Sequence, residues 1–151
     1  MFVFFVNLSI AHVIMIPMAV IHKTQIRMHH TDAAGLLFFG HQLALVHDAY
    51  ETLLEKMGMD YGTSLKKCNY LPPIVHVESD YKKALFVGDK ITISVKILHV
   101  GNSSFALDYK IHKNKILVGT AKTVHVTIDK KTREKIPLPQ NLRATLEKFA
   151  K

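Results

Sequence analysis

The spacing of apolar and polar residues predicts one long helix early in the chain and several strands after it. From residue 38 onward, apolar residues recur at alternating steps of four and three, which is typical of a helix with one buried face. These residues are Phe39, Leu43, Val46, Tyr50, Leu53 and Met57. Gly58 stands where this helix is expected to end, because glycine readily adopts the left-handed backbone that closes many helices. Ahead of the helix, residues 20–30 alternate well enough to predict a first strand.

After a connecting loop over residues 59–73, the pattern changes to the two-residue alternation of strands. We predict strands within residues 74–89, over 90–100, over 103–113 and over 116–129, and a short closing helix over 139–150. This order indicates at least four strands in a meander. A helix with so apolar a stripe needs a wide apolar surface, which a curved antiparallel sheet supplies. The chain is therefore predicted to be α+β, with a long central helix wrapped by a curved antiparallel β-sheet.

Composition adds limits to this picture. With 151 residues, 48% of them hydrophobic, the chain is long enough to form a single domain around its own core. Its net charge of +8 suits nucleic acid, an acidic membrane or a phosphate-bearing ligand. The lysines are scattered and form no helix-borne stripe, so no nucleic-acid partner is expected. The single cysteine, Cys68, excludes an internal disulfide framework and fits a reducing, cytoplasmic compartment.

The N-terminus is unusually apolar. The stretch MFVFFVNLSIAHVIMIPMAVIH contains no Lys or Arg before Lys23 and is long enough to span a bilayer. It lacks the basic region and the small-residue cleavage site of a signal peptide. Residues 1–19 are therefore interpreted as an extension ahead of a domain over residues 20–151. Three origins stay open: a gene-model extension with the true start at Met15 or Met18, a membrane-associating segment, or an apolar arm packed on the fold.

Asp32, within HHTDAAGLLFFG, is the candidate for chemistry, because the chain contains no G-x-S-x-G elbow, P-loop, G-x-G-x-x-G or H-E-x-x-H motif. Its ordinary interpretation is a capping or turn aspartate. Its functional interpretation follows from the apolar helix that begins near Phe38. Free N–H groups in the first helical turn polarise a carbonyl oxygen, and a facing carboxylate then acts as general base or as nucleophile. Gly35 and Gly40 would keep side chains out of the approach.

A metal site at His29, His30 and Asp32 is the alternative use of these residues. Adjacent residues of a strand point to opposite faces of the sheet. The three side chains are therefore not expected to converge on one ion, and no metal is predicted. Other histidines fall within strand patterns, where a structural role is expected. They include His99, His112 and His125.

The stretch TDAAGLLFFGHQLALVHDAYE resembles the signature of hot-dog-fold acyl-CoA thioesterases of the 4-hydroxybenzoyl-CoA thioesterase family. The stretch PIVHVESDYKKALFVGDKITISVKI resembles the second-strand region of that family, so that the similarity covers about residues 20–140. Within the family, VHDAYE and PIVH are most similar to 1,4-dihydroxy-2-naphthoyl-CoA hydrolases, which serve menaquinone or phylloquinone synthesis. The resemblance implies a hot-dog fold and hydrolysis of an aromatic acyl-CoA. A broader short-chain or phenylacyl-CoA thioesterase and a non-catalytic acyl-binding module stay open as alternatives.

The resemblance also implies roles for single residues. Asp32 matches the catalytic aspartate of the family, and the backbone N–H near Phe39 matches the group that polarises the thioester. Many relatives have Tyr followed by His or Phe where this chain has Phe38-Phe39, so polarisation rests on the backbone. His47 is expected near the acyl ring or the attacking water, with a structural hydrogen bond to Glu51 as its alternative. Glu51 is the reserve catalytic acid.

Substrate contacts and assembly are implied in the same way. Gly35, Lys82 and Lys83 are expected at the substrate, the two lysines through the phosphates of coenzyme A. Solvated surface lysines are the alternative. Hydrolysis of this kind needs no cofactor, and none is predicted. Because the family pairs its sheets and places its active sites between subunits, a homodimer or homotetramer is expected.

Overall fold

The computed structural model describes residues 19–59 and 61–151, apart from the side chain of Leu65. The interpretations of the N-terminal extension fall on residues 1–18, outside the described part. The elements are β1 (Val20–Gln25), the 3-10 turn η1 (Met28–His30), α1 (Phe39–Lys56), α2 (Ser64–Lys67), β2 (Tyr70–Leu71), β3 (Ile74–Tyr81), β4 (Lys90–Val100), β5 (Ser104–Lys113), β6 (Ile116–Val126), β7 (Ile128–Asp129) and α3 (Gln140–Ala150). No helix in these two ranges is long and apolar enough to cross a membrane.

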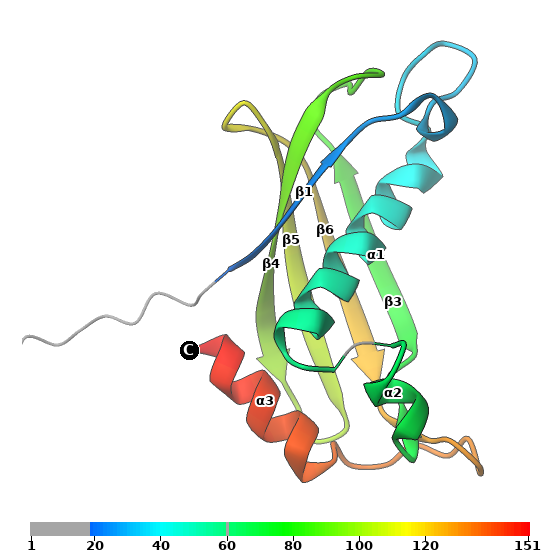
Figure 1. Ribbon diagram of the computed structural model, residues 1–151, viewed down its shortest axis with the longest axis vertical. Helices are drawn as coiled ribbons and strands as arrows, with labels where there is room; N and C mark the ends of the chain where they lie inside the picture. Colours follow the sequence, from blue (N-terminus) through cyan, green and yellow to red (C-terminus); the bar gives the residue numbers. More distant parts are fainter. Residues whose placement is uncertain (1–18, 60) are drawn as a thin grey trace, which may run out of the picture.

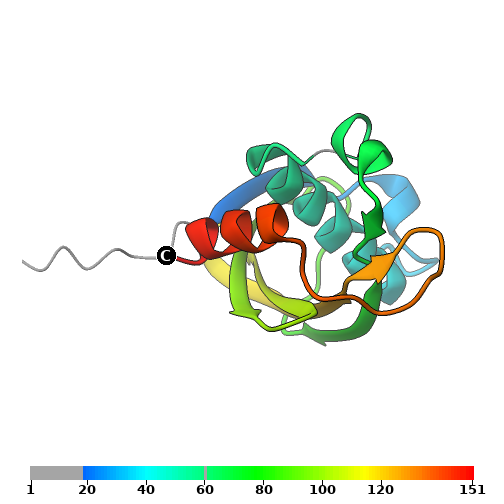
Figure 2. The ribbon, with the colours of Figure 1, turned by 90° about the horizontal axis from the view of Figure 1, so that it is seen from below.

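Five strands form one antiparallel sheet in the order β1-β4-β5-β6-β3. The sheet curves around α1, which lies along its inner face (Figures 1 and 2). The core lies between the two, where one side of α1 meets the inward side chains of the central strands. Inward residues of β4 and β5 are almost completely buried, among them Ile93, Val95, Leu107 and Tyr109. The predicted α+β architecture, a long central helix wrapped by a curved antiparallel sheet, is confirmed.

The predicted meander holds for β4, β5 and β6 but is wrong for β3. Because β4 pairs with β1 on one edge and with β5 on the other, it has no edge left for β3. β3 pairs instead with β6 at the far side of the sheet. The connection over residues 82–89 returns past the start of α1, where the amide of Leu37 donates to the carbonyl of Leu85 (2.8 Å). This crossing brings the end of β3 beside the first turn of the helix.

Three predicted segments differ in detail from the structure. β1 ends at Gln25, and the chain then forms the turn η1 instead of continuing as a strand to residue 30. The predicted loop over 59–73 contains the short helix α2 and the strand β2. The predicted strand over 116–129 is divided, because buried Thr127 donates its amide to Ser103 (2.9 Å) and ends the pairing with β5. β7 then pairs with β2 in a small second sheet.

The two ends of the helical stripe are buried to different extents. Val46, Tyr50 and Leu53 are buried as predicted, but Leu43 is only half-buried and Phe39 is 66% exposed. The first two turns of α1 therefore leave apolar side chains open. β3 is exposed along almost its whole length, with Val75 and Tyr81 about half accessible. One edge of the sheet and the adjoining helix face are thus uncovered in the single chain.

Candidate active site

Asp32 lies in a tight turn that leads into α1. The turn is closed by a bridge between Thr31 and Leu37, by the amide of Asp32 donating to Leu36 (2.9 Å), and by Gly35 at a φ of +74°. The carboxylate oxygen Oδ1 of Asp32 accepts hydrogen bonds from the amides of Ala34 (2.9 Å) and Leu36 (3.3 Å). The turn role considered from the sequence is therefore present. It uses one carboxylate oxygen and leaves Oδ2 free of partners among the described residues.

The first turn of α1 presents open amides. Phe38 is the N-cap and supplies no side-chain cap. The amides of Phe39 and Gly40 donate no hydrogen bond to any described residue, whereas His41 already donates to the carbonyl of Phe38 (2.9 Å). Unpaired amides at a helix start attract a partial negative charge, because the helix dipole adds to their own. The backbone amide of Phe39, which the resemblance implies as the polarising group, is therefore available to a carbonyl oxygen.

Three hydrogen bonds, made by two side chains, fix this turn to the end of β3. The hydroxyl of Tyr81 donates to the carbonyl of Phe39 (2.7 Å). The side-chain amide of Gln42, which is buried, donates to Ser79 Oγ (2.9 Å) and to the carbonyl of Asp80 (3.1 Å). Sequence reasoning missed both Gln42 and Tyr81. A signal for Gln42 existed, since it is a polar residue on the buried face of the helix and buried polar groups usually have partners.

An apolar cavity of about 210 Å³ lies between α1 and the inner face of the sheet. Its lining is Leu43, Val46, His47, Ile74, Val77, Tyr109 and Thr123. His47 thus lies at a cavity, and its contact with an acyl ring or a water molecule stays a prediction. Its Nε2 is 3.6 Å from Glu51 Oε1, which is within ion-pair range but longer than a hydrogen bond. Asp32 does not line this cavity.

Two side chains of the lining, Tyr109 and Thr123, form a buried series of hydrogen bonds with His125. Tyr109 Oη lies 3.2 Å from Thr123 Oγ1, and Thr123 Oγ1 lies 2.9 Å from His125 Nε2. The other ring nitrogen of His125 is 3.3 Å from the carbonyl oxygen of Pro72. Burial, with a smaller contribution from the nearby His47, lowers the pKa of His125 to about 4, although the hydrogen bond with the carbonyl of Pro72 acts in the opposite direction. The structural role expected for His125 is confirmed, since both of its nitrogens have partners and its ring stacks on Phe105 (4.6 Å).

Lys82 and Lys83 line a second cavity, of about 250 Å³, beside the start of α1. Leu36, Leu37, Gln42, Tyr81, Ala84 and Leu85 complete its lining. Both lysine amides donate to the carbonyl of Val118 (2.9 and 3.1 Å), so the backbone here is fixed. Neither lysine forms an ion pair with a described carboxylate. Gly35 lies outside both cavities.

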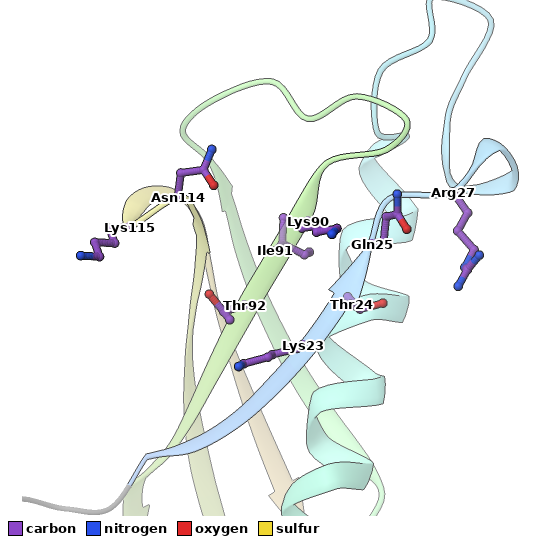
Figure 3. A pocket seen from close by; sticks show the side chains of 9 residues that line it. All are labelled: Lys23, Thr24, Gln25, Arg27, Lys90, Ile91, Thr92, Asn114 and Lys115. Carbon is purple, nitrogen blue, oxygen red and sulfur yellow. The ribbon is translucent and has the colours of Figure 1, made fainter.

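A larger basic pocket, of about 550 Å³, lies beside the end of β1, the start of β4 and the turn between β5 and β6 (Figure 3). Its cations are Lys23, Arg27, Lys90 and Lys115. Figure 3 shows the side chains of Lys23 and Lys115 directed to one side and that of Lys90 to the other. Because the charges do not converge, we interpret this pocket as a solvated positive surface and assign no ligand to it.

His29 and His30 occupy the turn η1 and not a strand, so the argument from opposite faces was wrong. Their ring centroids are 4.1 Å apart. Burial, together with the neighbouring His29 and His41, lowers the pKa of His30. Across residues 19–59 and 61–151, no three or more His, Cys, Asp or Glu side chains are grouped so as to hold a metal ion.

The long helix wrapped by a curved antiparallel sheet defines a hot-dog fold, in which Asp32 precedes open helix amides and a separate apolar cavity lies further along α1. The chain belongs to the thioesterase-like superfamily, whose family model matches residues 26–146. This confirms the family expected from the sequence.

Individual relatives are similar over most of their length. A 1,4-dihydroxy-2-naphthoyl-CoA hydrolase from Microcystis aeruginosa is 38% identical over 113 residues, which is 75% of this chain and 82% of the relative. A protein of the same name from Synechococcus elongatus is 33% identical over 123 residues, or 81% of this chain and 90% of that one. The crystal structure of a 1,4-dihydroxy-2-naphthoyl-CoA thioesterase from Synechocystis has a TM-score of 0.78 at 27% identity. It covers 85% of this chain and 95% of that one.

Proposed function

We propose that this chain hydrolyses an aromatic acyl-CoA, 1,4-dihydroxy-2-naphthoyl-CoA, to the free acid and coenzyme A. The observation that carries this proposal is the pairing of Asp32, fixed in its turn, with the open amides of Phe39 and Gly40. The names of the cyanobacterial relatives support the choice of acyl group. A place in menaquinone or phylloquinone synthesis is proposed from the resemblance of VHDAYE and PIVH. The single cysteine is compatible with action in the cytoplasm.

The reaction follows from these groups. The amide of Phe39 donates to the thioester oxygen and stabilises the negative charge that develops there. By one route Asp32 removes a proton from water, hydroxide adds to the thioester carbon, the C–S bond breaks, and the thiolate of coenzyme A takes a proton. By the other, Asp32 attacks the carbon itself, the C–S bond breaks and the thiolate of coenzyme A leaves and takes a proton; water then opens the resulting anhydride, which releases the acid and restores the carboxylate. His47 is proposed to contact the acyl ring or the water, with Glu51 as the reserve acid. Gly35 is proposed to leave the approach open, and Lys82 and Lys83 to bind the phosphates of coenzyme A.

A second copy of the chain is proposed to complete the site. Asp32 is exposed and does not line the cavity at His47. β3 is an edge strand, and its residues Ile74 and Val77, which line that cavity, are exposed. Pairing of two chains along β3 would cover this edge and bring the acid of one chain toward the cavity of the other. Val75→Lys, on the exposed part of β3, should give monomers in sedimentation and lose activity in parallel. A monomeric wild type with full activity would contradict this assembly.

The test of the activity uses purified full-length protein and 1,4-dihydroxy-2-naphthoyl-CoA. Asp32→Asn should lower turnover by about 100-fold or more, because a general base or nucleophile contributes at least that much. Asp48→Asn, on an exposed position of α1, is the matched control and should keep wild-type turnover. Wild-type turnover in Asp32→Asn would overturn the mechanism. Single turnover in heavy-oxygen water separates the two routes, since label enters the carboxylate of Asp32 only through the anhydride.

A further inference from the structure

The buried hydrogen bonds that join Tyr109, Thr123 and His125 allow only one arrangement of their hydrogens. The carbonyl oxygen of Pro72 can only accept, so the nitrogen facing it, His125 Nδ1, carries a hydrogen. His125 is neutral near pH 7, because burial lowers its pKa to about 4. Its Nε2 is therefore bare and accepts from Thr123 (2.9 Å). The opposite tautomer would place two acceptors against each other at Pro72.

The tautomer of His125 in turn determines the direction of the hydrogen bond between Thr123 and Tyr109. Thr123 has one hydroxyl hydrogen and donates it to His125, so toward Tyr109 it is an acceptor. Tyr109 must then donate its own hydrogen to Thr123. The hydrogen of the tyrosine is thereby turned toward Thr123, and the phenol oxygen keeps its capacity to accept. No described residue donates to this oxygen.

Tyr109 and Thr123 line the apolar cavity between α1 and β3. The wall around them is aliphatic, formed by Leu43, Val46, Ile74 and Val77. An acceptor without a donor is costly in such surroundings, so a ligand that supplies one gains more there than at a surface. His47, the other polar group of the lining, is about half exposed and can bond to water.

We propose that the phenol oxygen of Tyr109 accepts a hydrogen bond from a hydroxyl group on the ring of the bound acyl group. The site then selects hydroxylated aromatic acyl groups over unsubstituted and methoxy ones, which have no hydrogen to donate. Thr123 and His125 are positioning residues in this recognition, since they hold the tyrosine as an acceptor. The inference rests on the proposed function in one respect, namely that the cavity holds the acyl group.

The direct test measures binding of free acids, the products, by calorimetry. Wild-type protein should bind 1,4-dihydroxy-2-naphthoate about tenfold more tightly than 2-naphthoate or the dimethoxy acid, the effect of one additional hydrogen bond in an apolar site. Tyr109→Phe should bring this ratio close to one, with little change for 2-naphthoate. Tyr70→Phe is the matched control: Tyr70 is also buried but lies outside the cavity lining, so the ratio should stay at its wild-type value.

Thr123 gives an independent pair of variants. Thr123→Ser keeps the hydroxyl and should keep the preference, whereas Thr123→Val frees the hydrogen of Tyr109 and should lower it. Equal wild-type affinity for the acids, no binding of either, or an unchanged ratio in Tyr109→Phe would each overturn the inference. Turnover of the matching CoA esters separates it from the proposed function. Hydrolysis without preference removes only the inference, whereas preference in binding without hydrolysis of any ester removes only the enzymatic activity.

Discussion

The hydroxyl of Tyr81 donates to the carbonyl oxygen of Phe39 over 2.7 Å and so joins the end of β3 to the first residue of α1. Gln42, one turn further along the helix, makes a second connection to Ser79 and Asp80 on the same strand. The position of the open Phe39 amide is therefore set by an edge strand that lies about forty residues away in sequence. A candidate oxyanion donor held in this way moves whenever β3 moves.

Removing the hydroxyl of Tyr81 tests this connection. Tyr81→Phe should lower kcat several-fold with little change in KM, because the amide of Phe39 is proposed to stabilise mainly the charge of the transition state. The free energy of unfolding should fall by no more than about 1 kcal/mol, since the bond is solvent-exposed. Tyr61→Phe, in the loop after α1, serves as control and should keep wild-type kcat. An unchanged kcat in Tyr81→Phe would show that this bond does not position the amide.

A substitution at Gly119 should disturb the contact between Gln42 and β3 more strongly. A Cβ at this position would lie 2.9 Å from Gln42 Oε1 and 3.1 Å from the carbonyl oxygen of Asp80. Because Gln42 is buried and already bonded, Gly119→Ala should cost about 1–3 kcal/mol, the usual penalty of overpacking. Urea unfolding measures this cost. A Cβ at Gly40 would meet only side-chain atoms of Phe38, an exposed ring that can turn away, so Gly40→Ala should be close to neutral. Equal stability of the two variants would contradict this packing difference.

The turn role of Asp32 and its proposed catalytic role can be separated by substitution. Asp32→Asn retains an oxygen able to accept from Ala34 and Leu36, whereas Asp32→Ala removes it. Both variants should lose turnover, but only Asp32→Ala should lower the free energy of unfolding, by about 1 kcal/mol. Chemical denaturation of the two proteins gives this difference. If Asp32→Asn is destabilised as strongly as Asp32→Ala, the charge and not the acceptor maintains the turn.

His125 makes stability depend on pH. Burial lowers its pKa from the ordinary 6.5 to about 4 in the folded chain, so between these values the unfolded chain binds more protons. The free energy of unfolding should be highest above pH 6.5 and fall by up to about 3 kcal/mol as the pH approaches 4. Urea midpoints at pH 7 and pH 5 measure the effect. His125→Gln should flatten the profile, and His99→Gln, at an exposed position of β4, should not; a flat wild-type profile would exclude this source of pH dependence.

Local patterns in the sequence predicted the main elements, because buried positions recur every two residues in a strand and about every 3.6 residues in a helix. The stripe from Phe39 to Met57 gave the long helix to within a residue, and the alternation over residues 90–100 gave β4. The order of the strands was not predictable in this way. Alternation indicates that Ile74–Tyr81 is a strand, but pairing with β6 depends on residues some forty positions away.

The candidate site likewise contains residues that a local segment predicts and residues that depend on distant partners. Asp32, Gly35 and the open amides follow from one local segment, a turn leading into a helix. Gln42 and Tyr81 contribute through partners 37 to 42 residues away, and no local pattern identifies these partners. The wrong expectation for His29 and His30 arose from assuming that a strand continued to residue 30.

β3 also affects the tendency of the single chain to aggregate. An edge strand with unpaired N–H and C=O groups is a template for another strand, and β-branched Val75 and Val77 favour such pairing. The segment Ile74–Tyr81 contains no proline to interrupt it, and Glu78 and Asp80 are its only acidic residues. Newly synthesised chains at high local concentration are therefore expected to misassemble first at β3. The strand that borders the cavity is thus also the segment through which the protein would aggregate.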